Sequence, residues 1–261
     1  MSLLQIQNLN VSYLQAQGEN QVIHDVSLTL DKNTTYGIIG ESGSGKTTLM
    51  NAVLRLLNPK QTRVSGSVLF NSVDLLSMEP ETLNRIRWEE ISVVFQNSMN
   101  ILSPVHRIEQ QLRDIYLTHR PNTPKDAIDQ RIIYLFTLLH LDPIVRKHYP
   151  HELSGGMKQR VSIAMSLLFE PQLMILDEAT TALDAITQNR ILDELKKLQL
   201  DYDNTKLIIT HDLSVVRQIC EEVFILKDGR LVEAGPVEQV FHNPTHPYAQ
   251  QLVADYQRLI Q

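Results

Sequence analysis

The sequence has a single cysteine, no long apolar run and no block of basic residues. Because Cys220 stands alone, an intrachain disulfide is excluded, and a reducing cytoplasm is the expected compartment. No segment approaches the ~20 apolar residues of a membrane-spanning helix, and the N-terminus does not have the pattern of a signal peptide. The net charge of −6 argues against nucleic acid as a partner. With 43% hydrophobic residues among 261, the chain is expected to form one sizeable core with a subdomain attached.

A glycine-rich stretch follows the apolar residues 36–39. It has the form GxxxxGK[ST] and consists of Gly40, Glu41, Ser42, Gly43, Ser44, Gly45, Lys46, Thr47 and Thr48. In this context a strand delivers the chain, the glycines let the backbone wrap an anion, and a helix N-terminus presents its free N–H groups. Lys46 is expected to reach the β- and γ-phosphates of a nucleoside triphosphate, and the Thr47 hydroxyl to ligate Mg²⁺. The alternative, a strand-to-helix turn without a ligand, is disfavoured by these flanks.

A second candidate phosphate contact lies about 110 residues further along the chain. Ser154 suits a helix N-cap, and Gly155 and Gly156 leave the backbone amides after it uncovered for an anion. Two such helix starts in one chain have a natural use if two copies face each other, since each copy then covers the nucleotide held by the other. Taken alone, the stretch is also compatible with an ordinary serine-capped helix.

Two later apolar runs each end in polar residues. Residues 173–176 are followed by Asp177 and Glu178, and residues 207–210 by His211. Continuous apolar runs are typical of buried parallel strands, and open α/β sheets bind ligands at the carboxyl ends of their strands. Asp177 is therefore expected to hold Mg²⁺, Glu178 to polarise the attacking water, and His211 to contact the γ-phosphate.

In this order and at this spacing, the motifs resemble the ATP-binding cassette of ABC transporters over nearly the whole chain. The resemblance implies an α/β fold: a P-loop NTPase with a RecA-like core, an N-terminal antiparallel β subdomain and an inserted α-helical subdomain. Residues 1–261 would form a single ATP-binding domain, with the helical subdomain at about 80–165. The resemblance also implies an ATPase that uses ATP and Mg²⁺, with Lys46, Glu178 and His211 among its catalytic residues.

The same resemblance assigns roles to further residues. Tyr13 resembles the aromatic residue that stacks on adenine. Gln96 resembles the Q-loop glutamine, which touches Mg²⁺ and the attacking water and senses the transmembrane partner, so that it counts as catalytic, nucleotide-binding and metal-ligating. Residues 153–157 resemble the signature motif, and Asp184 the D-loop aspartate.

The pattern of apolar residues gives the chain's organisation. Short alternating runs within residues 1–35 and 64–71 predict a half-exposed antiparallel sheet. A helical pattern runs from about residue 80 to 150. Residues 227–230 contain Asp-Gly, which predicts a hairpin turn. After the helical stretch, strands and helices are expected to alternate over 173–177, 184–200, 206–210, 214–221 and 223–226.

Two local stretches resemble the peptide and nickel importer branch of this family. They are residues 149–152, directly before the signature, and His246-Pro247-Tyr248 near the C-terminus. A cassette without a fused membrane span also favours import over export. The expected function is an ATP-hydrolysing subunit that powers import of peptides or of nickel or metal chelates. Its expected partners are transmembrane permease subunits, a second cassette (an identical or a different chain) and, indirectly, an extracellular substrate-binding protein.

The expected location is the cytoplasmic face of the membrane, where the region beside Gln96 would receive a permease helix. Met99, Ile101 and Leu102 are the candidate apolar contacts. The alternative is that these three side chains pack beneath their own loop.

The sequence leaves two alternative functions open, each from a different class of protein. A soluble cassette acting on DNA or ribosomes usually carries a long coiled-coil insertion or two cassettes in one chain, and neither pattern is found here. A regulatory nucleotide-binding module without hydrolysis would not need Glu178 and His211, and both residues are present.

Overall fold

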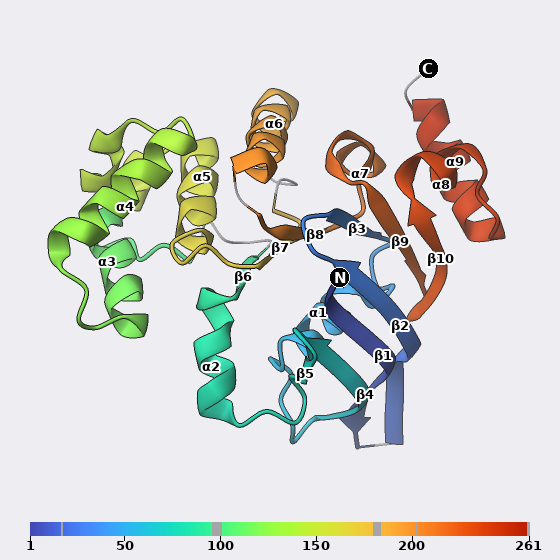
Figure 1. The fold of residues 1–261 in the computed structure, drawn as a ribbon. Coiled ribbons are helices and arrows are strands. Elements are labelled where there is room, and N and C mark those ends of the chain that lie inside the picture. The colour runs from blue at the N-terminus through green and yellow to red at the C-terminus, as the bar shows by residue number, and fades with distance from the viewer. Residues whose placement is uncertain (17, 96–100, 180–183, 202, 260–261) are drawn as a thin grey trace. The chain divides into compact units, whose positions relative to one another are not determined.

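The computed structural model describes residues 1–16, 18–95, 101–179, 184–201 and 203–259. The chain divides into two compact units, of which the first comprises residues 1–83 and 203–261 and the second residues 84–202 (Figure 1). Among the described residues, no helix combines the length and the apolar character that crossing a bilayer requires.

The first unit contains an antiparallel sheet built from the N-terminal residues. Its strands are β1 (Ser2–Gln15), β2 (Gly18–Asp31), β4 (Thr62–Phe70) and β5 (Val73–Asp74), in the order β2-β1-β4-β5. Along β2, buried Val26, Leu28 and Leu30 alternate with exposed neighbours, as expected for a sheet with one face on the core. The predicted half-exposed antiparallel sheet is therefore confirmed.

A second group of strands in the first unit carries the glycine-rich stretch. Strand β3 (Thr35–Ile39) lies between β8 (Thr205–Thr210) and β9 (Glu222–Lys227) and pairs with both in parallel. Strand β10 (Arg230–Pro236) returns antiparallel to β9 through the predicted Asp-Gly hairpin, in which Lys227 lies opposite Arg230. All residues of β3 and β8 are buried, which explains the apolar runs 36–39 and 207–209 within them.

Helices flank these parallel strands. They are α1 (Lys46–Val53), α7 (Leu213–Ile219), α8 (Val237–His242) and α9 (Pro247–Leu259). Helix α7 contacts β3 and β8, and α8 contacts β9 and β10 (Figure 1). The result within this unit is an α/β arrangement beside an antiparallel sheet, which confirms the predicted fold class.

The second unit is mainly helical. Helix α2 (Pro80–Glu89) begins in the first unit and ends in the second, where it is followed by α3 (Ile108–His119), α4 (Lys125–Leu138), the 3₁₀ turns η2 (Pro143–Lys147) and η3 (Pro150–Glu152), α5 (Gly155–Ser166) and α6 (Ala185–Asp201). Two parallel strands, β6 (Ile91–Val94) and β7 (Leu173–Asp177), pair within this unit. The helical pattern predicted over about 80–150 was wrong at β6, because the short run Ile-Ser-Val-Val pairs with β7 rather than forming a helix.

Salt bridges join the helices of the second unit. Arg113 on α3 donates two hydrogen bonds to the carboxylate of Asp129 on α4, at 2.6 and 2.8 Å. Arg146 on η2 lies 3.2 Å from Glu109 on α3. The hydrogen bonds from Arg113 lower the pKa of Asp129, so this carboxylate stays charged. Helices α3 and α4 and the turn η2 are thus held together by charge as well as by the buried apolar residues of α4.

Candidate functional site

The glycine-rich stretch forms a loop between the buried strand β3 and helix α1. Gly45 is the residue before the helix and has φ of 101°, in the left-handed region where side chains other than hydrogen are disfavoured. A Cβ atom at Gly45 would also lie 2.8 Å from Cδ1 of Ile23. The sequence therefore needs glycine here for two reasons, and the turn aims the first free N–H groups of α1 back at the loop.

The charged head of Lys46 lies inside this loop. The residue is only 6% exposed, and its Nζ atom donates hydrogen bonds to the carbonyl oxygens of Gly40 at 2.7 Å and Glu41 at 2.8 Å. The Ser44 hydroxyl is a further acceptor, at 3.4 Å. The loop thus gathers a positive charge and backbone amides at one place, which is the chemistry that a polyphosphate requires.

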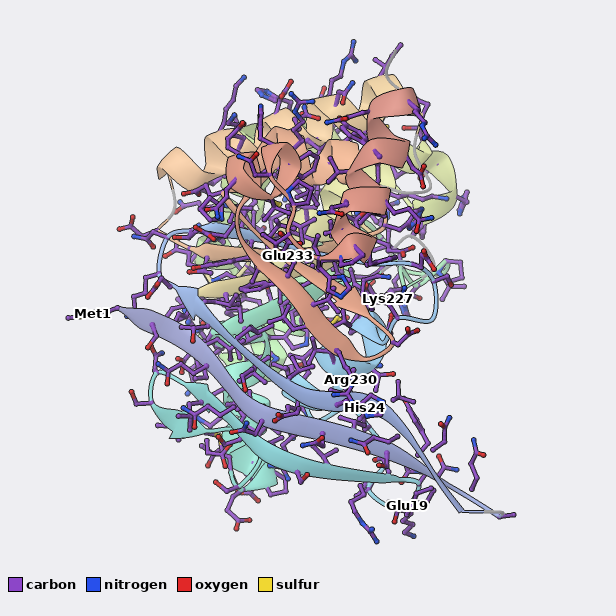
Figure 2. The ribbon with its side chains drawn as sticks, turned by 90° about the vertical axis from the view of Figure 1, so that its right-hand side faces the viewer. Met1, Glu19, His24, Lys227, Arg230 and Glu233 are labelled. Atoms are coloured by element: carbon purple, nitrogen blue, oxygen red, sulfur yellow. The ribbon has the colours of Figure 1, made fainter. Side chains whose placement is uncertain are left out.

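The outer side of the loop is supported by the β9–β10 hairpin and by β2. The Gly229 N–H donates to the carbonyl of Ser44 at 3.0 Å, and the Gly229 carbonyl accepts from the N–H of His24 at 2.9 Å. Figure 2 labels His24 on β2 beside the hairpin residues Lys227 and Arg230. Sequence reasoning missed this support, although the Asp-Gly turn that makes it was recognised as a hairpin.

Two further predicted site residues lie near this loop in the first unit. The hydroxyl of half-buried Tyr13, on β1, lies 3.3 Å from the Thr48 hydroxyl on α1. His211 is exposed and follows Thr210, which pairs with Ile39 across the parallel strands β8 and β3. Parallel strands have their carboxyl ends at the same edge of a sheet. Gly40 and His211, which directly follow β3 and β8, therefore both lie at the edge where the loop lies. Thr47 is exposed in the first turn of α1, as a metal-binding hydroxyl would be.

The second unit holds the two carboxylates and the signature residues. Asp177 is the buried last residue of β7, and half-buried Glu178 follows it with φ of 47°. A left-handed conformation is uncommon for glutamate and costs backbone energy. The predicted placement of both carboxylates at the end of a strand is what the structure shows.

The start of α5 is fixed by a short-range cap and by packing against Thr187 of α6. The Ser154 hydroxyl caps the helix by accepting from the N–H of Met157 at 3.3 Å, so the predicted N-cap is present. Gly156 packs so closely against Thr187 that a Cβ atom there would lie 2.7 Å from Cγ2 of Thr187. Thr187 in turn donates from its backbone N–H and its hydroxyl to Asp184, at 3.0 and 2.8 Å, and these bonds lower the pKa of Asp184. The signature residues and the predicted D-loop aspartate are therefore joined through one threonine.

Gln96 and Met99 lie outside the described residues, and their predicted roles stay predictions. The other two candidate contacts for a membrane partner differ from each other. Leu102 is 4% exposed and belongs to the core, whereas Ile101 is 59% exposed. The alternative in which the side chain packs under its loop therefore applies to Leu102.

The ABC transporter family model matches residues 23–181 of this chain. The oligopeptide transport ATP-binding protein OppD of Salmonella typhimurium is 39% identical over 248 residues, which are 95% of this chain and 74% of OppD. The dipeptide transport ATP-binding protein DppD of Bacillus subtilis is 38% identical over 260 residues, 98% of this chain and 77% of DppD.

A solved structure resembles the chain as well. It is the dimeric post-hydrolysis state of the ATP-binding cassette MJ0796 bound to ADP and Pi, with a TM-score of 0.78 and 28% sequence identity. The match covers 90% of this chain and 98% of that one.

Proposed function

The chain belongs to the ABC transporter family as an ATP-binding and ATP-hydrolysing subunit, and on this premise we propose that it powers the import of peptides. The observation that carries the proposal is the identity of 38–39% to OppD and DppD over at least 95% of the chain. Both relatives are named for peptide transport, which favours peptides over nickel or metal chelates.

In the proposed mechanism, the loop of residues 40–48 holds the phosphates of ATP. Backbone N–H groups at the start of α1 surround the β-phosphate, and Lys46 exchanges the carbonyls of Gly40 and Glu41 for phosphate oxygens. The Tyr13 ring stacks on adenine, with its hydroxyl beside Thr48. This arrangement binds the triphosphate mainly through the first unit.

Hydrolysis is assigned to metal-binding and catalytic side chains in this proposal. Thr47 and Asp177 supply a hydroxyl and a carboxylate, the hard oxygen donors that suit Mg²⁺, and Gln96 is assigned to the same ion. When bound, Mg²⁺ neutralises charge on the phosphate oxygens. Glu178 accepts a proton from the attacking water, and His211 holds the γ-phosphate.

The working unit is proposed to contain two cassettes. Ser154, Gly155 and Gly156 are at the surface or partly exposed at the start of α5, so that their amides and hydroxyl are available to the ATP held by another copy. The dimeric MJ0796 cassette supports such a pairing. Whether the second cassette is identical or different is decided by mixing this chain with its candidate partner and measuring the composition of the ATP-dependent dimer.

We place the permease contact on residues 101–106, the first described residues after Gln96. Ile101 and Val105, in one short loop, are 59% and 72% exposed and are therefore available to an apolar partner. The side chain of Gln111 on α3 fixes this loop through hydrogen bonds to Ser103 and His106. These residues thus present two apolar side chains from a hydrogen-bonded backbone. In this proposal they face a permease at the cytoplasmic side of the membrane. An extracellular substrate-binding protein would act on this chain only through the permease.

Uptake measurements test the proposed substrate. Cells that lack this chain but keep the rest of the transporter are given the wild-type chain or Lys46→Ala, and uptake of short labelled peptides and of labelled nickel is followed. We expect peptide uptake to return only with the wild-type chain. Restoration of nickel uptake without peptide uptake would contradict the peptide proposal and leave the ATPase assignment intact.

A further inference from the structure

A hydrogen bond connects the C-terminal helix α9 to the phosphate loop. Tyr248, the second residue of α9, is 6% exposed, and its hydroxyl accepts the backbone N–H of Glu41 at 3.1 Å. Glu41 is the second residue of the loop, and the two partners lie 207 positions apart in the sequence. Both belong to the first unit.

The position of Tyr248 is fixed by residues of the β9–β10 hairpin. The Glu233 carboxylate on β10 accepts the backbone N–H groups of Thr245 and His246, at 2.7 and 2.8 Å. The His246 ring accepts the N–H of Tyr248 at 3.2 Å, and Nζ of Lys227 lies 4.6 Å from the centre of the Tyr248 ring. Figure 2 labels Lys227 and Glu233 on this hairpin. These contacts therefore fix the orientation of the Tyr248 ring independently of the hydrogen bond to the loop.

The peptide groups of Glu41 are bonded on both sides. Its carbonyl accepts from Nζ of Lys46 at 2.8 Å and from the N–H of Ser44 at 3.1 Å, while its N–H donates to Tyr248. Lys46 gives up its carbonyl contact when it turns to phosphate, whereas the bond to Tyr248 does not depend on Lys46. Burial raises the pKa of Tyr248, so its hydroxyl remains protonated at neutral pH.

We propose that Tyr248 is a positioning residue for the phosphate loop, which it holds at Glu41 in the shape that binds the nucleotide. Through this one hydroxyl, helix α9 and its support by Glu233 set the affinity for ATP and ADP. The inference rests on the assignment of residues 40–48 as the nucleotide-binding loop. A loop that occupies its binding shape for a smaller fraction of the time has a proportionally weaker apparent affinity.

The decisive variant is Tyr248→Phe, which removes only the hydroxyl and keeps the ring beside Lys227. For the full chain, we expect the Kd values of ATP and ADP, measured by titration calorimetry, to rise about three- to tenfold, as for loss of one hydrogen bond. The two nucleotides shift equally because the loop holds the phosphates that they share. KM for ATP should rise by the same factor with kcat unchanged, the pattern of lost uniform binding.

The matched control is Tyr256→Phe, the same edit on the same helix. The ring of Tyr256 contacts that of Phe241 edge to face, with 5.8 Å between the ring centres. Among the hydrogen bonds that the structure gives for described residues, none joins Tyr256 to the loop. Its Kd values should equal those of the wild type. An equal shift in both variants would overturn the proposal, as would an unchanged Kd in Tyr248→Phe.

A double-mutant cycle separates positioning from packing. Glu233→Ala frees Thr245 and His246, and should weaken nucleotide binding about two- to fivefold by loosening the hydroxyl of Tyr248. If it acts through that hydroxyl, adding it to Tyr248→Phe produces no further loss. Fully additive losses of affinity in the double variant would overturn the proposal that Glu233 acts through the Tyr248 hydroxyl. Lys46→Ala separates failure of the loop assignment from failure of the role proposed for Tyr248. If Lys46→Ala still binds ATP at wild-type affinity, the assignment of residues 40–48 as the nucleotide-binding loop is wrong. If Lys46→Ala does not bind ATP but Tyr248→Phe binds it normally, only the role of Tyr248 is refuted.

Discussion

The phosphate loop and the start of α5 are both glycine-containing helix starts, but they are held in different ways. The loop relies on partners far away in the sequence: Gly229 of the β9–β10 hairpin bonds to Ser44, and Tyr248 of α9 bonds to Glu41. At the start of α5, the capping hydrogen bond spans three residues, from Met157 to Ser154. Thr187, which packs against Gly156, makes another three-residue pair with Asp184.

This difference has a physical consequence. A hydrogen bond between residues far apart in the sequence requires that a long chain segment be closed, which has an entropic cost. In this protein that cost is met by the folding of the whole first unit, so the shape of the loop depends on the fold of that unit. A short-range cap forms together with its own helix. We therefore expect nucleotide affinity to respond to changes across the first unit, and changes at α5 to act on local stability and on turnover.

The largest expected effect separates binding from hydrolysis. Glu178→Gln removes the proposed proton acceptor, and general-base catalysis is worth about 100- to 10,000-fold, so kcat should fall at least about 100-fold. ATP affinity should stay within about twofold of the wild type, because the loop of the first unit is untouched. ATPase assays and titration calorimetry measure the two quantities.

The exposed Glu81, in the first turn of α2, offers the control. Glu81→Gln makes the same chemical change and should leave kcat and affinity unaltered. Turnover near the wild-type level in Glu178→Gln would remove Glu178 from the catalytic role.

The second effect tests the long-range support directly. Gly229 has φ of 72°, and a Cβ atom there would lie 1.8 Å from the carbonyl oxygen of Val22. Gly229→Ala must shift the hairpin away from β2 and from Ser44, so the Kd for ATP should rise about tenfold or more, the equivalent of one or two lost hydrogen bonds.

Gly235 on the same hairpin separates this clash from backbone strain. It has φ of 154°, but the nearest atom to its added Cβ would be 3.7 Å away, on Val240. Gly235→Ala should lower the melting temperature without changing the Kd for ATP. Equal affinities in the two variants would show that the hairpin does not support the loop.

The sequence predicted the parts of the site whose chemistry is local. The glycine pattern before Lys46, the Ser154 cap and the carboxylates after an apolar strand all depend on neighbouring residues, and each is found at its predicted element. The roles of these residues with ATP and Mg²⁺ remain proposals, as does the role of Gln96.

The supports of the loop could not be predicted in the same way. An Asp-Gly hairpin and a C-terminal tyrosine carry no local signal that they bond to Ser44 and Glu41, since long-range contacts such as the pairing of β3 with β9 bring them there. Strand β6 was missed for a similar reason, because its four residues become a strand by pairing with β7. The exposure of Ile101 and the burial of Leu102 likewise depend on packing that adjacent residues do not encode.

The smallest expected effect concerns the cap of α5. Ser154→Ala removes the acceptor of the Met157 N–H and should cost about 1 kcal/mol, which lowers the melting temperature by roughly 2–4 °C for a chain of this size. Ser154→Asp keeps a good N-cap and should restore the melting temperature. The negative charge of the aspartate would repel the phosphates of the ATP that Ser154 is proposed to cover. The ATPase turnover of Ser154→Asp should therefore be below that of the wild type although its stability returns. At protein concentrations too low for dimerisation, both variants should bind ATP as the wild type does. A Kd raised in Ser154→Ala as much as in Gly229→Ala would mean that α5 also shapes the loop, and the contrast between local and long-range support would be wrong.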